Sequence, residues 1–275
     1  MSNILIEKNL DTKDGKIFYW LSKEWKADGE ILFFLHGMTG DHTMFDEQVK
    51  YFHKNYNILL WDAPAHGKSR PYQDFNYEKA AGVVKAIFDI EKIHYAVFIG
   101  QSMGGFLTQA VIKRYPEIVT AFVAIDSTPY GSGYYSKSDV FWLKQVEWMS
   151  YLFPLKTMKK VMAKQNTVTT AGYENMISML EPYGKKELCH LMGIGYAGFL
   201  EDNCKLDIAC PVLLILGEKD NTGKVTTYNK QWKEKTGYRL VVVEDAAHNS
   251  NVDQPQKVNQ VIEEFIQYIF REKKC

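Results

Sequence analysis

Short, continuous apolar runs recur along the chain, and they restrict its fold more than any other feature. Runs of this kind, without alternating polar residues, are typical of strands covered on both faces, as in a parallel sheet. Between them lie longer segments with apolar residues at helical spacing, such as Phe75–Ile93 and Gln256–Phe270. This alternation predicts an α/β fold with a doubly wound sheet. The runs are Ile31–Leu35, Ile58–Trp61, Ala96–Ile99, Val119–Ile125, Val212–Leu216 and Leu240–Val243.

Two parts of the chain depart from this alternation. Ile4–Lys8 and Lys16–Trp20 are expected to form an antiparallel hairpin at one edge of the sheet. From about Pro129 to Lys205 no strand-like run occurs, and short helical stretches rich in Trp, Tyr, Phe and Met take its place. We therefore expect residues 1–128 and 206–275 to form one core with an eight-stranded, mostly parallel sheet, and residues 129–205 to form an inserted helical cap.

Charge and cysteine content narrow the class of partner. Lys plus Arg equals Asp plus Glu at 33 each, whereas nucleic-acid binding usually needs a basic excess. No apolar stretch approaches the ~18 residues of a membrane-spanning helix. The four cysteines are far apart, as expected for free thiols in a reducing compartment. We expect a cytoplasmic monomer or homodimer that acts on a small molecule, with neither nucleic acid nor membrane as a partner.

A serine stands in an unusual setting within the stretch VFIGQSMGGF, residues 97–106. A strand-like run ends at Gly100, Ser102 follows, and a helical pattern begins at Met103. A tight turn between strand and helix would expose the hydroxyl, and Gly100 and Gly104 would remove the side chains that clash there. The free N–H groups at the start of the helix would also face a developing oxyanion. The pattern predicts that Ser102 is a nucleophile.

Five motifs in order resemble those of the α/β-hydrolase family, and the resemblance covers nearly the whole chain. Two of them carry an alanine, Ala65 and Ala247, where the family usually has glycine. The motifs are Phe34-Leu35-His36-Gly37-Met38, Asp62-Ala63-Pro64-Ala65-His66-Gly67-Lys68-Ser69, Gly100-Gln101-Ser102-Met103-Gly104, Leu216-Gly217-Glu218-Lys219-Asp220 and Asp245-Ala246-Ala247-His248.

By that resemblance Ser102 is the nucleophile, His248 the general base and Asp220 the acid that orients the base. Asp220 and His248 each follow a strand-like run, so both are expected at the same sheet edge as Ser102. Asp126 also ends such a run, and some members of the family place their acid there, so it stays the alternative.

The resemblance also implies the remaining parts of the site. The backbone N–H groups of Met38 and Met103 would form the oxyanion hole, with His36 and Gly37 lining the site. The aromatic residues of the cap would both pack its small core and cover the site, which makes Trp142 and Trp148 candidates for the pocket wall.

The activity implied is that of a serine hydrolase that cleaves a small or medium ester, thioester or lactone. Alternatives are a C–C bond hydrolase or perhydrolase with the same triad, and a non-catalytic ligand-binding protein. No cofactor and no metal are expected. Gly193–Gly198 fits the dinucleotide pattern G-x-G-x-x-G, but it lies in a helical stretch rather than directly after a strand.

Overall fold

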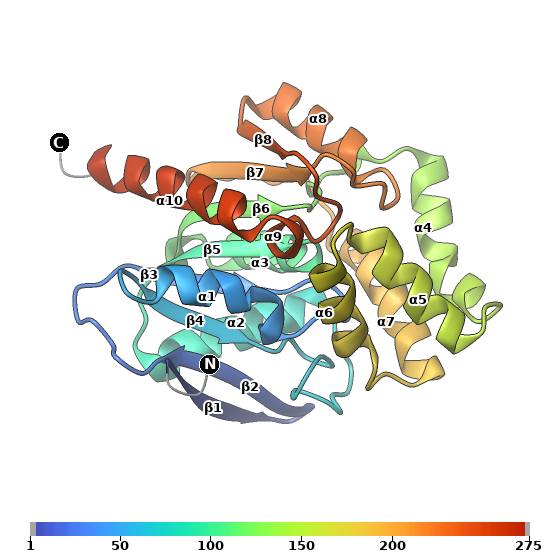
Figure 1. Ribbon diagram of the computed structural model, residues 1–275, viewed down its shortest axis with the longest axis horizontal. Helices are drawn as coiled ribbons and strands as arrows, with labels where there is room; N and C mark the ends of the chain where they lie inside the picture. Colours follow the sequence, from blue (N-terminus) through green and yellow to red (C-terminus); the bar gives the residue numbers. More distant parts are fainter. Residues whose placement is uncertain (1–3, 273–275) are drawn as a thin grey trace.

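The computed structural model describes residues 4–272, with a single eight-stranded sheet at its centre (Figure 1). The strand order is β1-β2-β4-β3-β5-β6-β7-β8. β2 pairs antiparallel with both β1 and β4, and all other pairs are parallel. The strands are β1 (Leu5–Thr12), β2 (Gly15–Ser22), β3 (Ile31–Leu35), β4 (Asn57–Trp61), β5 (Ala96–Gln101), β6 (Val119–Ile125), β7 (Val212–Gly217) and β8 (Arg239–Val243).

Helices cover both faces of this sheet, which explains why its strands are continuous apolar runs. α1 (Asp46–Phe52) and α10 (Pro255–Glu272) lie on the face toward the viewer in Figure 1, and α2 (Tyr77–Glu91) and α3 (Met103–Arg114) lie behind it. Every residue of β4 and β5 is buried. The predicted α/β fold, with its mostly parallel sheet and its antiparallel hairpin at one edge, is confirmed.

The hairpin is longer than its apolar residues indicate. Its strands pair from Leu5 opposite Ser22 to Thr12 opposite Gly15. The outer half of β1 alternates between exposed and half-buried residues, because an edge strand needs only one apolar face. Because its residues are partly polar, this half of β1 does not stand out in the sequence as a continuous apolar run.

A group of helices follows β6 and precedes β7, at the right of the sheet in Figure 1. They are α4 (Lys137–Ser150), α5 (Leu155–Asn166), α6 (Thr170–Leu180) and α7 (Lys185–Ala197), flanked by short 3-10 helices at Ser132–Tyr134 and Gly198–Glu201. α4 packs on α7, and α5 packs on α6. We call these helices the cap; that residues 129–205 form a separate inserted domain stays a prediction. The pattern Gly193–Gly198 lies at the end of α7 and its following turn, away from any strand.

α8 (Val225–Thr236) and α9 (Ser250–Asp253) complete the core. Because β5, β6, β7 and β8 are parallel neighbours, the segments after them emerge at one edge of the sheet. Ser102, Asp126, Asp220 and His248 all belong to those segments. None of the helices within residues 4–272 is both long and apolar enough to cross a membrane.

Candidate active site

Ser102 occupies the turn between β5 and α3 in a strained backbone conformation. Its φ is 49° and its ψ is −112°, a region that costs a residue with a side chain about 1–3 kcal/mol. A Cβ on Gly100 would collide with the backbone of Gly104, and one on Gly104 would collide with the carbonyl of Leu35. The glycines therefore permit the tight turn that exposes the hydroxyl, as the sequence predicts.

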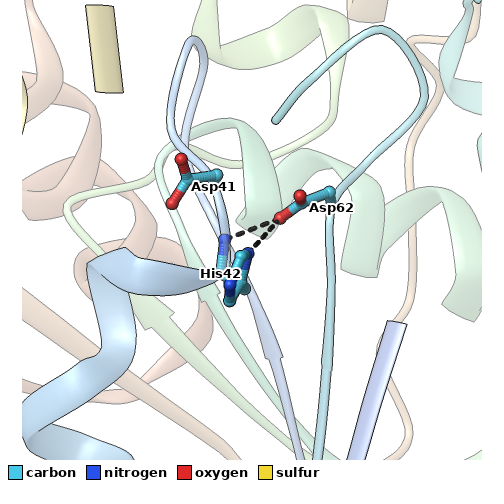
Figure 2. A group of neighbouring side chains, drawn as sticks. All are labelled: Asp41, His42 and Asp62. Carbon is cyan, nitrogen blue, oxygen red and sulfur yellow. Dashed lines mark hydrogen bonds and ion pairs between the residues drawn. The ribbon is translucent and has the colours of Figure 1, made fainter. Parts of the chain in front are cut away.

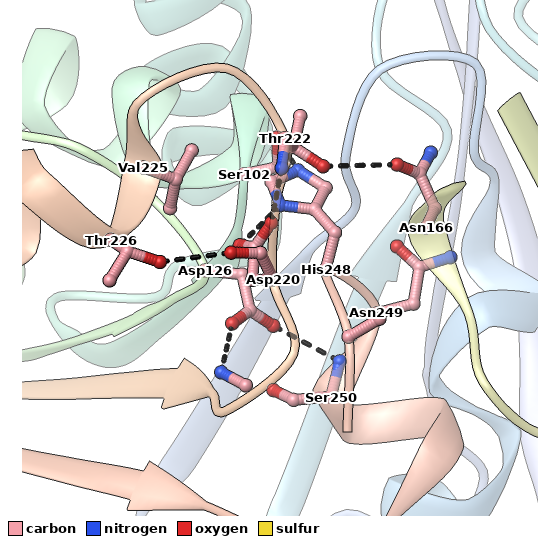
Figure 3. A network of polar contacts seen from close by, with 12 residues as sticks. Ser102, Asp126, Asn166, Asp220, Thr222, Val225, Thr226, His248, Asn249 and Ser250 are labelled. Carbon is pink, nitrogen blue, oxygen red and sulfur yellow. Dashed lines mark hydrogen bonds and ion pairs between the residues drawn. The ribbon is translucent and has the colours of Figure 1, made fainter. Parts of the chain in front are cut away.

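Two hydrogen bonds join Ser102, His248 and Asp220 into a chain (Figure 3). The distance from Ser102 Oγ to His248 Nε2 is 2.9 Å, and from His248 Nδ1 to Asp220 Oδ2 it is 2.8 Å. With Nδ1–H donating to the carboxylate, Nε2 is the nitrogen that can accept the serine proton. The three side chains that the resemblance implied do converge.

Electrostatics favour an ionised Asp220 beside a basic His248. Burial raises the pKa of Asp220, but the imidazole and the N–H of Thr222 outweigh it, so the net pKa lies below the usual value. Burial lowers the pKa of His248, but Asp220 outweighs it, so the net pKa lies above 6.5. The carboxylate thus makes the imidazole a stronger base.

Asp126 lies next to this chain but not in it (Figure 3). Its Oδ1 accepts a hydrogen bond from the N–H of Gly217 at 2.7 Å, and its Oδ2 accepts one from the N–H of Ser250 at 3.0 Å. Burial, together with the nearby Asp220, raises the pKa of Asp126 to about 8. The structure therefore pairs Asp220 with the imidazole, and Asp126 fastens the end of β7 to the segment that follows β8.

The loop that carries His248 is fixed from several sides. The side chain of Gln101, adjacent to the serine, donates to the carbonyl of His248 at 2.7 Å. The N–H of Asn249 donates to the carbonyl of Asn166, the last residue of α5, at 2.8 Å. The histidine loop thus contacts both the serine turn and the cap.

Asp253 is the strongest link between this loop and the cap. Its carboxylate is buried and accepts hydrogen bonds from the N–H of Ala247 at 3.0 Å and from the N–H of Val168 at 3.0 Å. It also accepts the N–H and the hydroxyl of Thr169, at 3.1 and 2.7 Å. One carboxylate thus holds both the residue before His248 and the junction between α5 and α6 (residues 167–169).

Sequence reasoning missed Asp253. The residue stands in the polar stretch Asn251-Val252-Asp253-Gln254, which has the composition of a solvated turn. Its partners on the cap lie more than 80 residues away along the chain. Only the fold brings them together.

The loop after β3 passes directly against the serine. A Cβ on Gly37 would collide with the side chain of Gln101 and lie 3.3 Å from the Cβ of Ser102. This close approach places Met38 next to the nucleophile, and Met103 begins α3 on its other side. The arrangement is compatible with the expected oxyanion hole of the Met38 and Met103 N–H groups, which stays a prediction.

His36 supports that loop. The imidazole is buried, and its Nε2 accepts a hydrogen bond from the N–H of Ala63 at 2.9 Å. Burial keeps the pKa of His36 below its usual value. His36 therefore braces this loop, and Gly37 lies against the turn that carries Ser102, so their role as site-lining residues stays a prediction.

A pocket opens above Ser102 and His248, between the core and the cap. It holds about 800 Å³ of empty space, including its open mouth. Asn166, Thr222 and Lys224 contribute polar groups to its wall. Apolar side chains from both the core and the cap line it, among them Met38, Met103, Phe106, Leu143, Met176 and Phe199.

Trp142 and Trp148 do not line this pocket, so their prediction is wrong. Both lie on the outer face of α4, with 58% and 55% of their surface exposed. Leu143 reaches the pocket instead, because adjacent helical residues point about 100° apart. Composition identified the cap as aromatic, but not which face of α4 would turn inward.

A second group of polar side chains, Asp41, His42 and Asp62, lies at the ends of β3 and β4 (Figure 2). Asp62 is buried, and its Oδ1 accepts from both the backbone N–H and Nδ1 of His42 at 2.8 Å. Its Oδ2 accepts the N–H of Lys68 at 2.7 Å. Asp41 caps the next turn by accepting the N–H of Thr43. These hydrogen bonds explain why the three side chains lie together: they connect the loop after β3 to the loop after β4.

Comparison with known proteins agrees with the fold. The model of the alpha/beta hydrolase family matches residues 32–261, and the chain belongs to this family. A 3-oxoadipate enol-lactonase from Acinetobacter baylyi is 26% identical, over 86% of this chain and 89% of its own length.

A second relative and a solved structure extend this comparison. The relative, an (E)-2-((N-methylformamido)methylene)succinate hydrolase from the same bacterium, is 22% identical, over 96% of this chain and 99% of its own length. The solved structure of a hydrolase from Pseudomonas aeruginosa superposes with a TM-score of 0.77 at 19% identity, over 94% of this chain and 98% of that one. The family, its fold and its hydrolase character are therefore shown.

Proposed function

We propose that the protein is a serine hydrolase that cleaves a small or medium carboxylic ester, thioester or lactone through an acyl-enzyme on Ser102. The observation that carries this proposal is the chain of hydrogen bonds from Ser102 Oγ through His248 to Asp220, at 2.9 and 2.8 Å. It gives the serine, a weak nucleophile, a base in His248, and it gives that base an orienting carboxylate in Asp220.

In the first half-reaction Ser102 Oγ attacks the carbonyl carbon while His248 Nε2 takes the hydroxyl proton. The carbonyl oxygen becomes an oxyanion between the N–H groups of Met38 and Met103. The C–O or C–S bond then breaks, and the leaving group takes the proton from His248. In the second half-reaction His248 removes a proton from water, which attacks the acyl-enzyme. His248 then gives that proton to Ser102 Oγ as the bond to the acyl group breaks and the acid is released.

The pocket supports the substrate class. Its methionine, phenylalanine and leucine side chains suit an apolar acyl or ring group, and the flexible methionines adapt to its shape. The lactonase among the relatives supports keeping lactones in this class, because a lactone is an internal ester cleaved by the same two steps.

A C–C bond hydrolase or a perhydrolase would use the same three residues on another substrate. A protein that only binds a ligand is less well supported, since binding alone does not require the strained backbone of Ser102. A cytoplasmic location and a monomeric or homodimeric state remain predictions.

The test is turnover of a panel of p-nitrophenyl esters and lactones by the wild-type protein and by Ser102→Ala. Loss of the nucleophile is expected to lower kcat by about 10⁴-fold or more, with an unchanged circular dichroism spectrum. Ester turnover by S102A at the wild-type rate would refute the proposal. Inactivity of the wild-type protein on esters, with activity on a C–C substrate, would favour the alternative.

A further inference from the structure

Exposed apolar side chains gather on the outer side of the cap. Of the fifteen large hydrophobic residues exposed in the described part of the chain, seven lie between residues 141 and 161. They are densest in residues 148–153, the end of α4 and the following turn, which we call the cap tip. There Leu152 is 70% exposed, and Trp148, Tyr151 and Phe153 are exposed as well. In Figure 1 the connection between α4 and α5 lies at the right edge, away from the sheet.

The backbone of the cap tip forms a hydrogen-bonded turn. The N–H groups of Tyr151, Leu152 and Phe153 donate to carbonyls three residues earlier, at 3.1 to 3.2 Å. The ammonium of Lys185 on α7 donates to the carbonyls of Ser150, at 2.9 Å, and of Phe153. The backbone polar groups named here are paired within the protein, while the apolar side chains face outward. An apolar environment could therefore receive the tip without leaving these groups unpaired.

The surroundings of the cap tip are basic. Residues 148–173 contain no Asp or Glu and four lysines, and of these Lys156 and Lys160 are exposed one and two turns beyond the tip. Two acids of nearby helices already have cationic neighbours. Glu187 pairs with Arg70, and Glu181 lies 4.0 Å from Lys159. The tip thus combines Trp, Tyr, Phe and Leu with a segment that carries lysines and no acidic residue.

We propose that the cap tip docks on an anionic lipid surface. Aromatic side chains favour the boundary between water and acyl chains, and lysines beside them are attracted to anionic headgroups while their stems lie along apolar surface. The sequence argued against a membrane because no segment could span one, but surface docking needs no such segment.

A second copy of this chain fits the same surface less well. A symmetric dimer through the tip would bring the lysines of one copy against those of the other, with no acidic residue in the segment to offset them. An anionic headgroup layer supplies the opposite charge. The charge of the segment therefore favours an anionic lipid surface over a second copy.

Co-sedimentation with unilamellar vesicles tests the proposal without any turnover, so it is independent of the proposed function. The wild-type protein is expected to bind vesicles that contain phosphatidylglycerol more tightly than vesicles of phosphatidylcholine alone, and less tightly at high salt. Leu152→Ser with Phe153→Ser should weaken binding by about tenfold or more, because two apolar anchors are lost. Lys156→Glu with Lys160→Glu should weaken it similarly.

The matched control replaces exposed apolar residues on the core, Ile90→Ser with Tyr95→Ser, and should bind as the wild type does. Circular dichroism confirms that each variant is folded. No binding to the anionic vesicles, or equal binding by the wild-type and L152S/F153S proteins, would overturn the proposal. A dimer in sedimentation velocity that L152S/F153S dissociates, without vesicle binding, would assign the surface to a second copy instead.

Discussion

The candidate triad combines backbone strain at Ser102 with two nearby carboxyl groups whose pKa values are shifted. The φ of 49° at Ser102 costs stability, but it places the hydroxyl oxygen 2.9 Å from the imidazole. Two carboxylates lie near that imidazole, and their environments move their pKa values in opposite directions: below the usual value for Asp220 and to about 8 for Asp126. Such separation allows one carboxylate to stay charged as the orienting group while the other serves the fold.

The two carboxylates can be distinguished by isosteric substitution. Asp220→Asn should lower kcat by about 10³–10⁴-fold, because the amide no longer favours the tautomer with Nδ1–H. Asp126→Asn should change kcat far less, but cost about 1–3 kcal/mol in the free energy of unfolding, since its amide N–H₂ would face a backbone N–H. Ester kinetics and urea unfolding measure both effects. A larger loss of kcat in folded D126N than in D220N would make Asp126 the catalytic acid.

The pH profile follows from the raised pKa of His248. Only the neutral imidazole accepts the serine proton, so kcat/KM should fall as the pH drops through this pKa, with a midpoint above 6.5. Asp220 is the main group that raises it, so in D220N the residual activity should show a lower midpoint. Initial rates from pH 5 to 9 give both values. A wild-type midpoint at or below 6.5 would contradict the raised pKa of His248.

At the scale of elements, hydrogen bonds join the cap to the histidine loop. The junction between α5 and α6 shares the carboxylate of Asp253 with the N–H of Ala247, and the end of α5 accepts from Asn249. A second tie between cap and core, the ion pair of Arg70 with Glu187 on α7, involves neither the histidine loop nor Asp253. These two ties allow docking of the cap to be separated from positioning of the base.

Asp253→Asn should slow the reaction through His248 rather than through substrate binding. The variant replaces one acceptor oxygen with an amide that faces N–H donors, so the loop loses its anchor. We expect kcat to fall by about tenfold with a small change in KM, since a displaced base affects the transition state most. The rate of labelling by a fluorophosphonate should fall in parallel.

Glu187→Gln is the control, because it weakens the other tie and leaves the histidine loop intact. It should keep both kcat and the labelling rate near the wild-type values. If D253N and E187Q lost activity equally, Asp253 would have only a structural role.

At the scale of the whole molecule, the features that depend on local pattern were predictable. Strands β3 and β6 have the predicted bounds, because buried parallel strands are continuous apolar runs. The serine turn was predictable because its glycines stand within two residues of Ser102. The inward face of α4 and the contacts of Asp253 were not, since both depend on partners that only the tertiary fold supplies.

Two left-handed backbone positions also depend on the tertiary fold and not on local sequence. Ala65, where the family usually has glycine, has a φ of 65°, and Asp245 has a φ of 54°. The sequence shows a residue with a side chain at both positions, yet the fold imposes the conformation that favours glycine. Their neighbours in the loops therefore decide the backbone there, against local preference.

The central claim is that Ser102 is a nucleophile activated by His248. Its most direct measurement is labelling with a fluorophosphonate, followed by mass spectrometry of the peptides. A single phosphonyl adduct on Ser102, absent from S102A and slowed by at least about 10³-fold in His248→Ala, is the predicted result. An unlabelled Ser102, or equal labelling in H248A, would contradict it.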